Sequence, residues 1–180
     1  MKEITIKDKT FVEFLSEDNI QARIADLARQ LNKEYAGKDP LIVSVLNGAF
    51  LFTADLVRHL DFDPEIQFMR LSSYEGGTSS TGQMRVLLDL SHSPAGHDVL
   101  IVEDIVDTGR TLDWLRRDLL HKGAKSVKIA TLLFKEEMYL FESPPEHYCF
   151  RIPNEFVVGY GLDYAERGRN PRAIYSLKPE

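Results

Sequence analysis

The chain has 180 residues, of which 43% are hydrophobic and 28% charged, and its formal net charge is −6 at pH 7. This length and composition are typical of one globular domain that buries its own core. The negative charge argues against a protein whose main task is to bind phosphate backbones, so we expect no nucleic-acid partner. The single cysteine excludes an internal disulfide and favours a reducing compartment.

The sequence carries no recognisable export or membrane signal. The first fifteen residues include Glu3, Asp8 and Glu13, and therefore lack the apolar core of a signal peptide. No apolar run approaches the roughly 20 residues that a membrane helix needs. We expect a cytoplasmic protein without a membrane partner.

Apolar periodicity predicts alternating helices and strands. The first helix is expected at residues 16–36, with Ser16 as its N-cap and Gly37 as its stop. The further expected elements are strands at 41–46, 65–74, 83–90, 99–104, 126–135 and 156–164, helices at 49–60 and 110–123, a glycine-rich loop at 75–82 and an irregular stretch at 136–153. This order predicts an α/β fold with a mostly parallel sheet, in one domain over residues 1–180.

Residues 99–112, VLIVEDIVDTGRTL, carry the strongest chemical signal. Their apolar run ends in Glu103 and Asp104, which we place at the carboxyl end of a strand, where α/β sheets bind ligands. Two carboxylates there must meet water, cations or hydroxyl donors. The turn that follows consists of Asp107, Thr108, Gly109, Arg110 and Thr111. Its amides and hydroxyls at a helix N-terminus suit a phosphate, so the stretch combines acceptors for a diol with a phosphate site, as a ribose 5-phosphate requires.

Other phosphate and metal motifs are excluded. Residues 77–83 have the glycine spacing of a Walker A loop, but Gln83 stands where the lysine belongs. The pattern G-x-G-x-x-G does not occur, and the five histidines show no metal-ligand spacing.

The stretch 99–112 resembles the phosphoribosyl-pyrophosphate signature of the type I phosphoribosyltransferases. Further segments narrow the resemblance to the hypoxanthine-guanine phosphoribosyltransferases. These are LLFK (132–135), NEFVVGYGLDY (154–164) and Arg169 for the base-binding part, VSVLNGAFLFTADL (43–56) for the first pyrophosphate loop, and LSSYEGGTSSTG (71–82) for the flexible catalytic loop. The similarity spans nearly the whole chain, which is thereby identified as a member of the 6-oxopurine branch.

The resemblance implies the family's fold and reaction. The fold would have a small base-binding hood, formed by the N-terminal segment and about 135–180, and a flexible loop at about 73–84. The reaction would transfer the 5-phosphoribosyl group from phosphoribosyl pyrophosphate to N9 of hypoxanthine or guanine, with Mg²⁺, giving IMP or GMP and pyrophosphate. Since relatives are dimers or tetramers, a homodimer or homotetramer is expected.

The resemblance also assigns roles on the ribose side. Glu103 and Asp104 would hold the ribose hydroxyls, directly or through a metal and waters, and the turn 107–111 would hold the 5-phosphate. Asp107 would face N7 of the purine as general base, a role that contributes ~10²–10⁴-fold when well placed. Without the resemblance, Asp107 would be interpreted as a helix N-cap.

On the base side, the resemblance implies that Lys135 donates a hydrogen bond to O6 of the purine. This contact would select oxo purines over adenine. Phe156 would stack on the ring, and the backbone of Val157 would read its edge. Without the resemblance, Lys135 is a solvated lysine, while Phe156 and Val157 are core strand residues.

On the pyrophosphate side, Asp163 would hold a second Mg²⁺, and Arg169 would contact pyrophosphate. Leu46, Asn47 and Gly48 match a loop with a non-proline cis peptide. Many relatives carry lysine or arginine at the position of Asn47, so a charge contact or an intersubunit contact there is lost. Ser73 and Tyr74 begin the loop expected to close over the leaving group and exclude water.

Three alternatives stay open at this point. The nearest is a related enzyme for adenine, orotate or xanthine, of which xanthine is the hardest to exclude because it shares the 6-oxo group. Another is a non-catalytic nucleotide sensor that binds RNA or DNA, which the acidity of the chain and the intact flexible-loop sequence disfavour. The third is a scaffold that has lost catalysis, although every expected contact position holds a competent residue.

Overall fold

The computed structural model describes residues 2–73 and 84–179. Tyr74 and nearly all of the expected flexible loop at 73–84 therefore lie outside the described residues, as does the Walker-like stretch 77–83. Of Ser73 the backbone is described, as the last residue of a strand.

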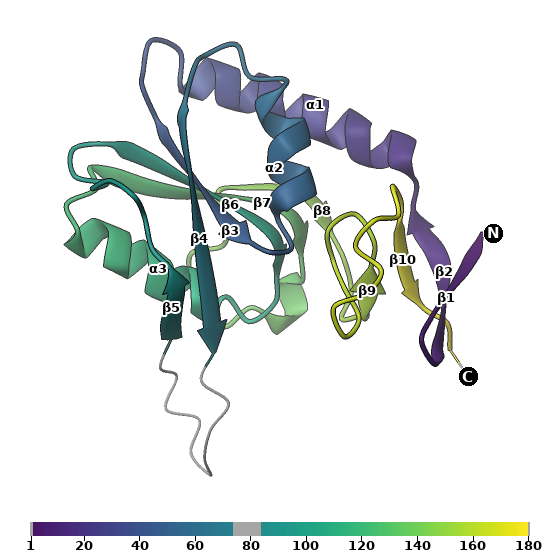
Figure 1. The fold of residues 1–180 in the computed structure, drawn as a ribbon. Helices are drawn as coiled ribbons and strands as arrows, with labels where there is room; N and C mark the ends of the chain where they lie inside the picture. Colours follow the sequence, from purple (N-terminus) through teal and green to yellow (C-terminus); the bar gives the residue numbers. More distant parts are fainter. Residues whose placement is uncertain (1, 74–83, 180) are drawn as a thin grey trace.

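A six-stranded sheet forms the centre of the molecule, in the order β5-β4-β3-β6-β7-β8 (Figure 1). Its strands are β3 (Leu41–Leu46), β4 (Glu65–Ser73), β5 (Met84–Leu88), β6 (Asp98–Val106), β7 (Ser126–Phe134) and β8 (His147–Arg151). All neighbouring pairs are parallel except β4 and β5, which are antiparallel. The expected α/β fold with a mostly parallel sheet is confirmed.

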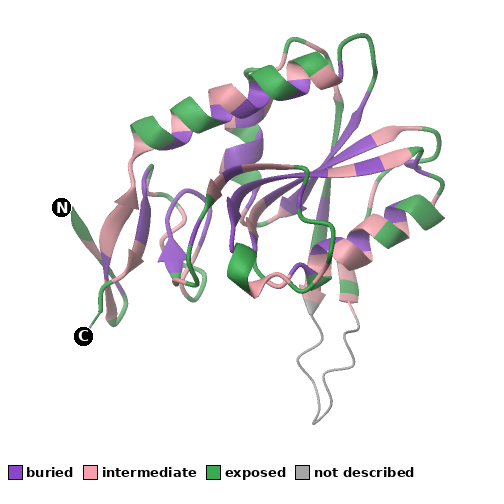
Figure 2. Cartoon of the chain, turned by 180° about the vertical axis from the view of Figure 1, so that it is seen from behind, coloured by how far each residue is buried: buried purple, intermediate pink, exposed green. Residues whose placement is uncertain are grey.

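Helices cover both faces of this sheet. Helices α1 (Glu17–Glu34) and α2 (Phe50–Val57) pack on one face in a core that includes Ile42 and Leu100, and α3 (Arg110–His121) packs on the other with Val43 and Ile101. Neighbouring residues of one strand thus enter opposite cores, which explains the uninterrupted apolar runs of β3 and β6. Figure 2 shows these central strands as mostly buried.

A second, four-stranded sheet joins the two ends of the chain, in the order β1-β2-β10-β9. It consists of β1 (Glu3–Ile6), β2 (Lys9–Leu15), β10 (Ile174–Leu177) and β9 (Val157–Val158), all antiparallel. Phe11, Val158 and Tyr175 form its core. Both termini lie at this sheet (Figure 1), so residues near the end of the chain are held beside those near its start.

Most expected elements are present, but the boundaries of the acidic strand were wrong. Strand β6 continues to Val106, so Glu103 and Asp104 lie within the strand rather than at its end. The pairing with β7 extends the strand, because Ile105 and Val106 pair with Leu133 and Phe134, whereas the pairing with β3 ends at Val102.

Four strands were not predicted, and one predicted strand is shorter than expected. Strand β8 lies in the stretch expected to be irregular and belongs to the larger sheet, and β1, β2 and β10 had not been foreseen. Of the expected strand 156–164, only Val157–Val158 is one. Strand β10 obtains its pairing with β2 from the other end of the chain, and β1, β2 and β8 are short strands without the long apolar run by which the central strands were predicted.

Among the described residues, none of the helices is long and apolar enough to cross a membrane.

Candidate active site

Two adjoining pockets open at the carboxyl ends of β6 and β7. The first, of about 230 Å³, is lined by Glu103, Ile105, Val106, Asp107, Thr108, Gly109, Arg110, Thr111 and Leu112. The second, of about 220 Å³, is lined by Asp104, Ile105, Asp107, Lys135, Phe156, Val157, Leu162 and Asp163. Ile105 and Asp107 line both, so the structure brings most of the expected site residues into one continuous region.

The turn 107–111 leads directly into α3. The N-cap of this helix is Gly109, in the left-handed conformation with φ 79°, and its carbonyl accepts from the amide of Asp113 at 2.9 Å. Asp107 lies two residues earlier, so the interpretation of Asp107 as the N-cap was wrong. The amides of the turn lie at the positive end of the helix dipole, where an anion is favoured.

Glu103 and Asp104 form a buried acidic pair. Glu103 is only 8% exposed, and its carboxylate accepts from the Asp104 amide at 3.1 Å, while that of Asp104 accepts from the Ile105 amide at 2.8 Å. Burial raises the pKa of both carboxyl groups, and the Asp104 charge raises the pKa of Glu103 further. No cationic side chain of the described residues forms a salt bridge with either one. The oxygen atoms of the pair are therefore available to accept hydrogen bonds from hydroxyl groups or to bind a cation.

Two glycines allow the loop after β3 to pack against this pair. The peptide bond Leu46–Asn47 is cis, as the resemblance implied. A Cβ on Gly48 would lie 1.6 Å from Oδ2 of Asp104, and a Cβ on Gly161 would lie 2.1 Å from the Gly48 carbonyl oxygen. The loop after β3, the acidic pair and the 159–162 turn are thus in direct contact, with no room for a side chain on either glycine.

Lys135 follows the last residue of β7 and is buried rather than solvated, at 7% exposed. Its amide donates to the Val106 carbonyl at 2.9 Å, which fixes the backbone beside β6. Its ammonium group lies 2.9 Å from Oδ1 of Asp107 and 3.5 Å from Oδ1 of Asn154. A buried lysine held by a carboxylate in a pocket is a candidate for ligand recognition.

Phe156 forms a wall of the second pocket and is 46% exposed, although it is large and apolar. Its ring centroid lies 6.2 Å from that of Phe11 and 5.9 Å from that of Tyr164, both contributed by the small sheet and its neighbouring turn. This support leaves an aromatic surface at the pocket that a planar ring can cover.

Asp163 and Arg169 form an ion pair at 2.8 Å beside the second pocket. Arg169 also donates to the Gly161 carbonyl at 2.7 Å, and the Glu166 amide donates to Asp163 at 2.7 Å. Arg169 itself lines neither pocket, and neither do Leu46, Asn47 or Gly48.

The carboxylates fit an oxygen-liganded divalent cation that shares its ligands with a substrate. Within residues 2–73 and 84–179, no group of three or more His, Cys, Asp or Glu side chains is arranged to hold a metal by itself. Mg²⁺ is commonly bound by one or two carboxylates together with substrate oxygens. Glu103 and Asp104 satisfy this description, because they are adjacent carboxylates without a cationic partner in that part of the chain. Asp163 has the right chemistry but is already paired with Arg169.

The sequence did not reveal several residues of this region. Ile105 and Leu162 line the pockets, and Asn154 contacts Lys135. An apolar residue in a buried strand gives no sign of a ligand nearby. The contact between Lys135 and Asn154 leaves no sign in the sequence either, because the two residues are 19 positions apart and only the path of the chain through β8 brings them together.

Comparison with known proteins agrees with this geometry. The family model described as "Phosphoribosyl transferase domain" matches residues 13–165. The hypoxanthine-guanine phosphoribosyltransferase of Lactococcus lactis is 48% identical over 174 residues, which cover 96% of this chain and 94% of that protein. That of Streptococcus agalactiae is 47% identical over 92% of each chain.

Solved structures give the same result. The crystal structure of a hypoxanthine phosphoribosyltransferase from Staphylococcus aureus has a TM-score of 0.88 and 42% identity, covering 93% of this chain and 91% of that one. A hypoxanthine phosphoribosyl transferase of Trypanosoma cruzi has a TM-score of 0.89 and 38% identity, covering 98% and 95%. The chain belongs to the phosphoribosyltransferase family, in its hypoxanthine-guanine branch.

Proposed function

We propose that this protein is a purine-salvage enzyme, which transfers the 5-phosphoribosyl group of phosphoribosyl pyrophosphate to N9 of hypoxanthine or guanine. The bond from C1 of the ribose to pyrophosphate breaks, the bond from C1 to N9 forms, and the purine loses a proton. The observation that carries this proposal is the pair of adjoining pockets that share Asp107. The names of relatives at 47–48% identity agree with it.

The first pocket suits the ribose 5-phosphate. The turn 107–111 offers amides and hydroxyls for the 5-phosphate, and the arginine side chain of Arg110 adds positive charge. Glu103 lines the same pocket, so its carboxylate is within the space where the ribose hydroxyls would lie. Holding the ribose at both ends limits its motion during transfer, which is a large part of what a transferase contributes.

The second pocket suits a 6-oxopurine. Phe156 offers a stacking surface, Val157 offers backbone groups, and Lys135 offers a charged donor for O6. Adenine would present an amino group to that donor and leave it unpaired, a mismatch that can be worth as much as ~10⁴–10⁵ in selectivity. The base preference therefore follows from one buried lysine.

Asp107 is the group that we propose to accept the purine proton. It lines both pockets, so it lies between the sugar side and the base side, and its side chain is 51% exposed and therefore reachable by a ligand. As the base enters, N7 and O6 would face Asp107 and Lys135 together.

Mg²⁺ completes the proposal. Glu103, Asp104 and Asp163 are the residues that would hold it, and when bound it offsets the negative charge of the departing pyrophosphate. Arg169 and the amides of Leu46, Asn47 and Gly48 would contact the same leaving group, and Ser73 and Tyr74 would begin the closing loop.

A turnover assay tests the proposed function. Purified protein with phosphoribosyl pyrophosphate, Mg²⁺ and either hypoxanthine or guanine should release one pyrophosphate per IMP or GMP formed, and chelation of Mg²⁺ should stop both. Absence of nucleotide with both bases, from folded protein in the presence of Mg²⁺, would contradict it.

We also propose a cytoplasmic homodimer or homotetramer. Support comes from exposed apolar side chains on the outer strands, where Ile66 and Phe68 of β4 and Leu87 and Leu88 of β5 are between 38% and 47% exposed. Large apolar side chains exposed at the edge of a sheet are available to a protein–protein contact. Light scattering coupled to gel filtration would give the mass of the assembly, and a mass near 20.6 kDa would contradict the proposal.

A further inference from the structure

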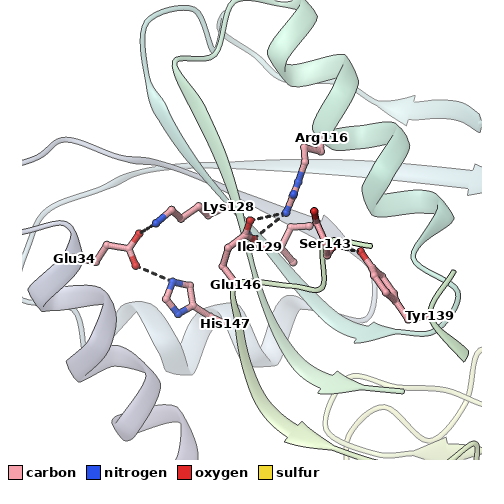
Figure 3. A network of polar contacts seen from close by, with 8 residues as sticks. All are labelled: Glu34, Arg116, Lys128, Ile129, Tyr139, Ser143, Glu146 and His147. Atoms are coloured by element: carbon pink, nitrogen blue, oxygen red, sulfur yellow. Dashed lines mark hydrogen bonds and ion pairs between the residues drawn. The ribbon is translucent and has the colours of Figure 1, made fainter. Parts of the chain in front are cut away.

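The loop between β7 and β8 lies behind the phosphate-binding turn. Residues 136–146, here called the support loop, contribute no residue to the lining of either substrate pocket. The loop is nevertheless fixed at both ends. At its start the Met138 amide donates to the Lys135 carbonyl at 3.0 Å, and at its end Glu146 accepts two hydrogen bonds from Arg116 of α3, at 2.8 and 2.9 Å (Figure 3).

Two contacts join the support loop to the turn. The ring of Tyr139 lies against Gly109, so closely that a Cβ on Gly109 would be 2.2 Å from the ring atom Cε2. The next residue, Leu140, donates its amide to the Thr108 carbonyl at 3.2 Å. The turn therefore has the ligand pocket on one side and the support loop on the other.

Tyr139 is itself held from several directions. Its hydroxyl donates to the Ser143 carbonyl at 2.7 Å, as Figure 3 shows, and its ring meets the edge of Phe134 with centroids 5.3 Å apart. Phe134 is the last residue of β7 and immediately precedes Lys135. A fixed aromatic ring is a rigid support, because it has few rotatable bonds.

We propose that Tyr139 is a positioning residue for the 5-phosphate. Its ring supports Gly109 in the left-handed conformation, and this conformation aims the amides of the turn at the ligand. Tyr139 touches neither substrate, so it acts through Gly109. This inference rests on the proposed function only in identifying the phosphate that the turn receives.

Direct binding tests it without requiring turnover. Calorimetry would measure the dissociation constants of ribose 5-phosphate, which needs the turn, and of inorganic pyrophosphate, which does not. We expect Tyr139→Ala to weaken ribose 5-phosphate at least about tenfold, because small displacements of a binding group are costly. Pyrophosphate affinity should change less than about twofold, since no pyrophosphate contact lies on the turn.

Two variants serve as controls. Tyr139→Phe keeps the ring and should bind ribose 5-phosphate as the parent does, and Leu140→Ala removes a side chain that is 60% exposed while keeping the amide, with the same expectation. Equal weakening of both ligands by Tyr139→Ala, or no weakening of either, would overturn the proposal. An inactive parent whose ribose 5-phosphate binding still depends on Tyr139 would contradict the proposed function alone.

Discussion

The ammonium group of Lys135 lies 2.9 Å from the carboxylate of Asp107, although the two residues follow different strands. The contact arises because β6 and β7 are parallel neighbours whose carboxyl ends meet at one edge of the sheet. O6 and N7 are neighbours on the same edge of a purine. Because Lys135 and Asp107 are in contact, one base can meet both of them at once, with O6 at the lysine and N7 at the aspartate.

Asp107→Asn should lower kcat by roughly 10²–10⁴-fold, the usual contribution of a general base. The amide keeps the shape of the side chain but no longer accepts the purine proton, so KM for phosphoribosyl pyrophosphate should change little. Steady-state kinetics with hypoxanthine would measure both. Asp113→Asn, on the first turn of α3, is the control and should retain activity. Turnover within a few-fold of the parent in Asp107→Asn would remove the general-base role.

Lys135→Ala should erode the discrimination between hypoxanthine and adenine by about 100-fold or more, because O6 loses its charged donor. The ratio of kcat/KM for the two bases is the measurement. Lys128→Ala is a control on β7, the strand that precedes Lys135, since Lys128 pairs with Glu34 (Figure 3) and lines neither pocket. Unchanged selectivity in Lys135→Ala would move base recognition to another residue.

Glu103→Gln should stabilise the protein at pH 7 while lowering its activity. The pKa of Glu103 is raised by burial and by Asp104, so the folded state holds its proton above the pH at which the unfolded chain loses it. As pH rises above the pKa of this glutamate in the unfolded chain, the free energy of unfolding falls, because the buried group resists ionisation. Glutamine does not ionise, so the variant does not lose this stability. We expect a gain of about 1–2 kcal/mol in the free energy of unfolding.

The gain should shrink as pH falls through the ordinary pKa of a glutamate, about 4.3, because below it the carboxyl is protonated in both states, and chemical denaturation at several pH values would show this. Asp98→Asn, on the same strand, is expected to do the opposite at neutral pH, because the Ser126 hydroxyl lowers the pKa of Asp98. A Glu103→Gln protein that is less stable than the parent at pH 7 would show that the buried carboxyl does not destabilise the fold at that pH.

Gly48→Ala should lower kcat/KM by about 100-fold or more, since a displacement near 1 Å in a reacting group is enough for such a loss. The added methyl would lie 1.6 Å from Asp104, so either the carboxylate or the loop must move. Gly37→Ala is the control: it has φ 70° but no heavy atom within 4 Å of its Cβ, and should cost about 1 kcal/mol of stability without affecting kinetics. Parent-like activity in Gly48→Ala would show that the contact is unimportant.

The sequence was most informative where function and local pattern coincide. The acidic pair and the turn 107–111 form a motif that is specific for one superfamily. The helix after them has clear apolar periodicity, and the strand before them is an uninterrupted apolar run. The same pattern did not show where β6 ends, because Ile105 and Val106 continue the apolar run after the acidic pair. Only pairing with Leu133 and Phe134 extends the strand.

The parts that could not be predicted depend on distant contacts. Strand β10 pairs with β2, more than 150 residues earlier, and neither has a long apolar run. The support that Tyr139 gives to Gly109 is equally invisible, since a tyrosine in a stretch broken by Pro144 and Pro145 has no periodicity. The residues that give the turn its chemistry are consecutive in the sequence, whereas the residues that hold the turn in place come from distant positions.

The most direct measurement is a competition between bases. The parent protein would receive limiting phosphoribosyl pyrophosphate, Mg²⁺ and equal concentrations of hypoxanthine and adenine, and the nucleotides would be separated by chromatography. We expect IMP with no detectable AMP, because the Lys135 ammonium donates a hydrogen bond that an oxo group at position 6 accepts and an amino group does not. AMP as a major product, or no nucleotide at all, would contradict it.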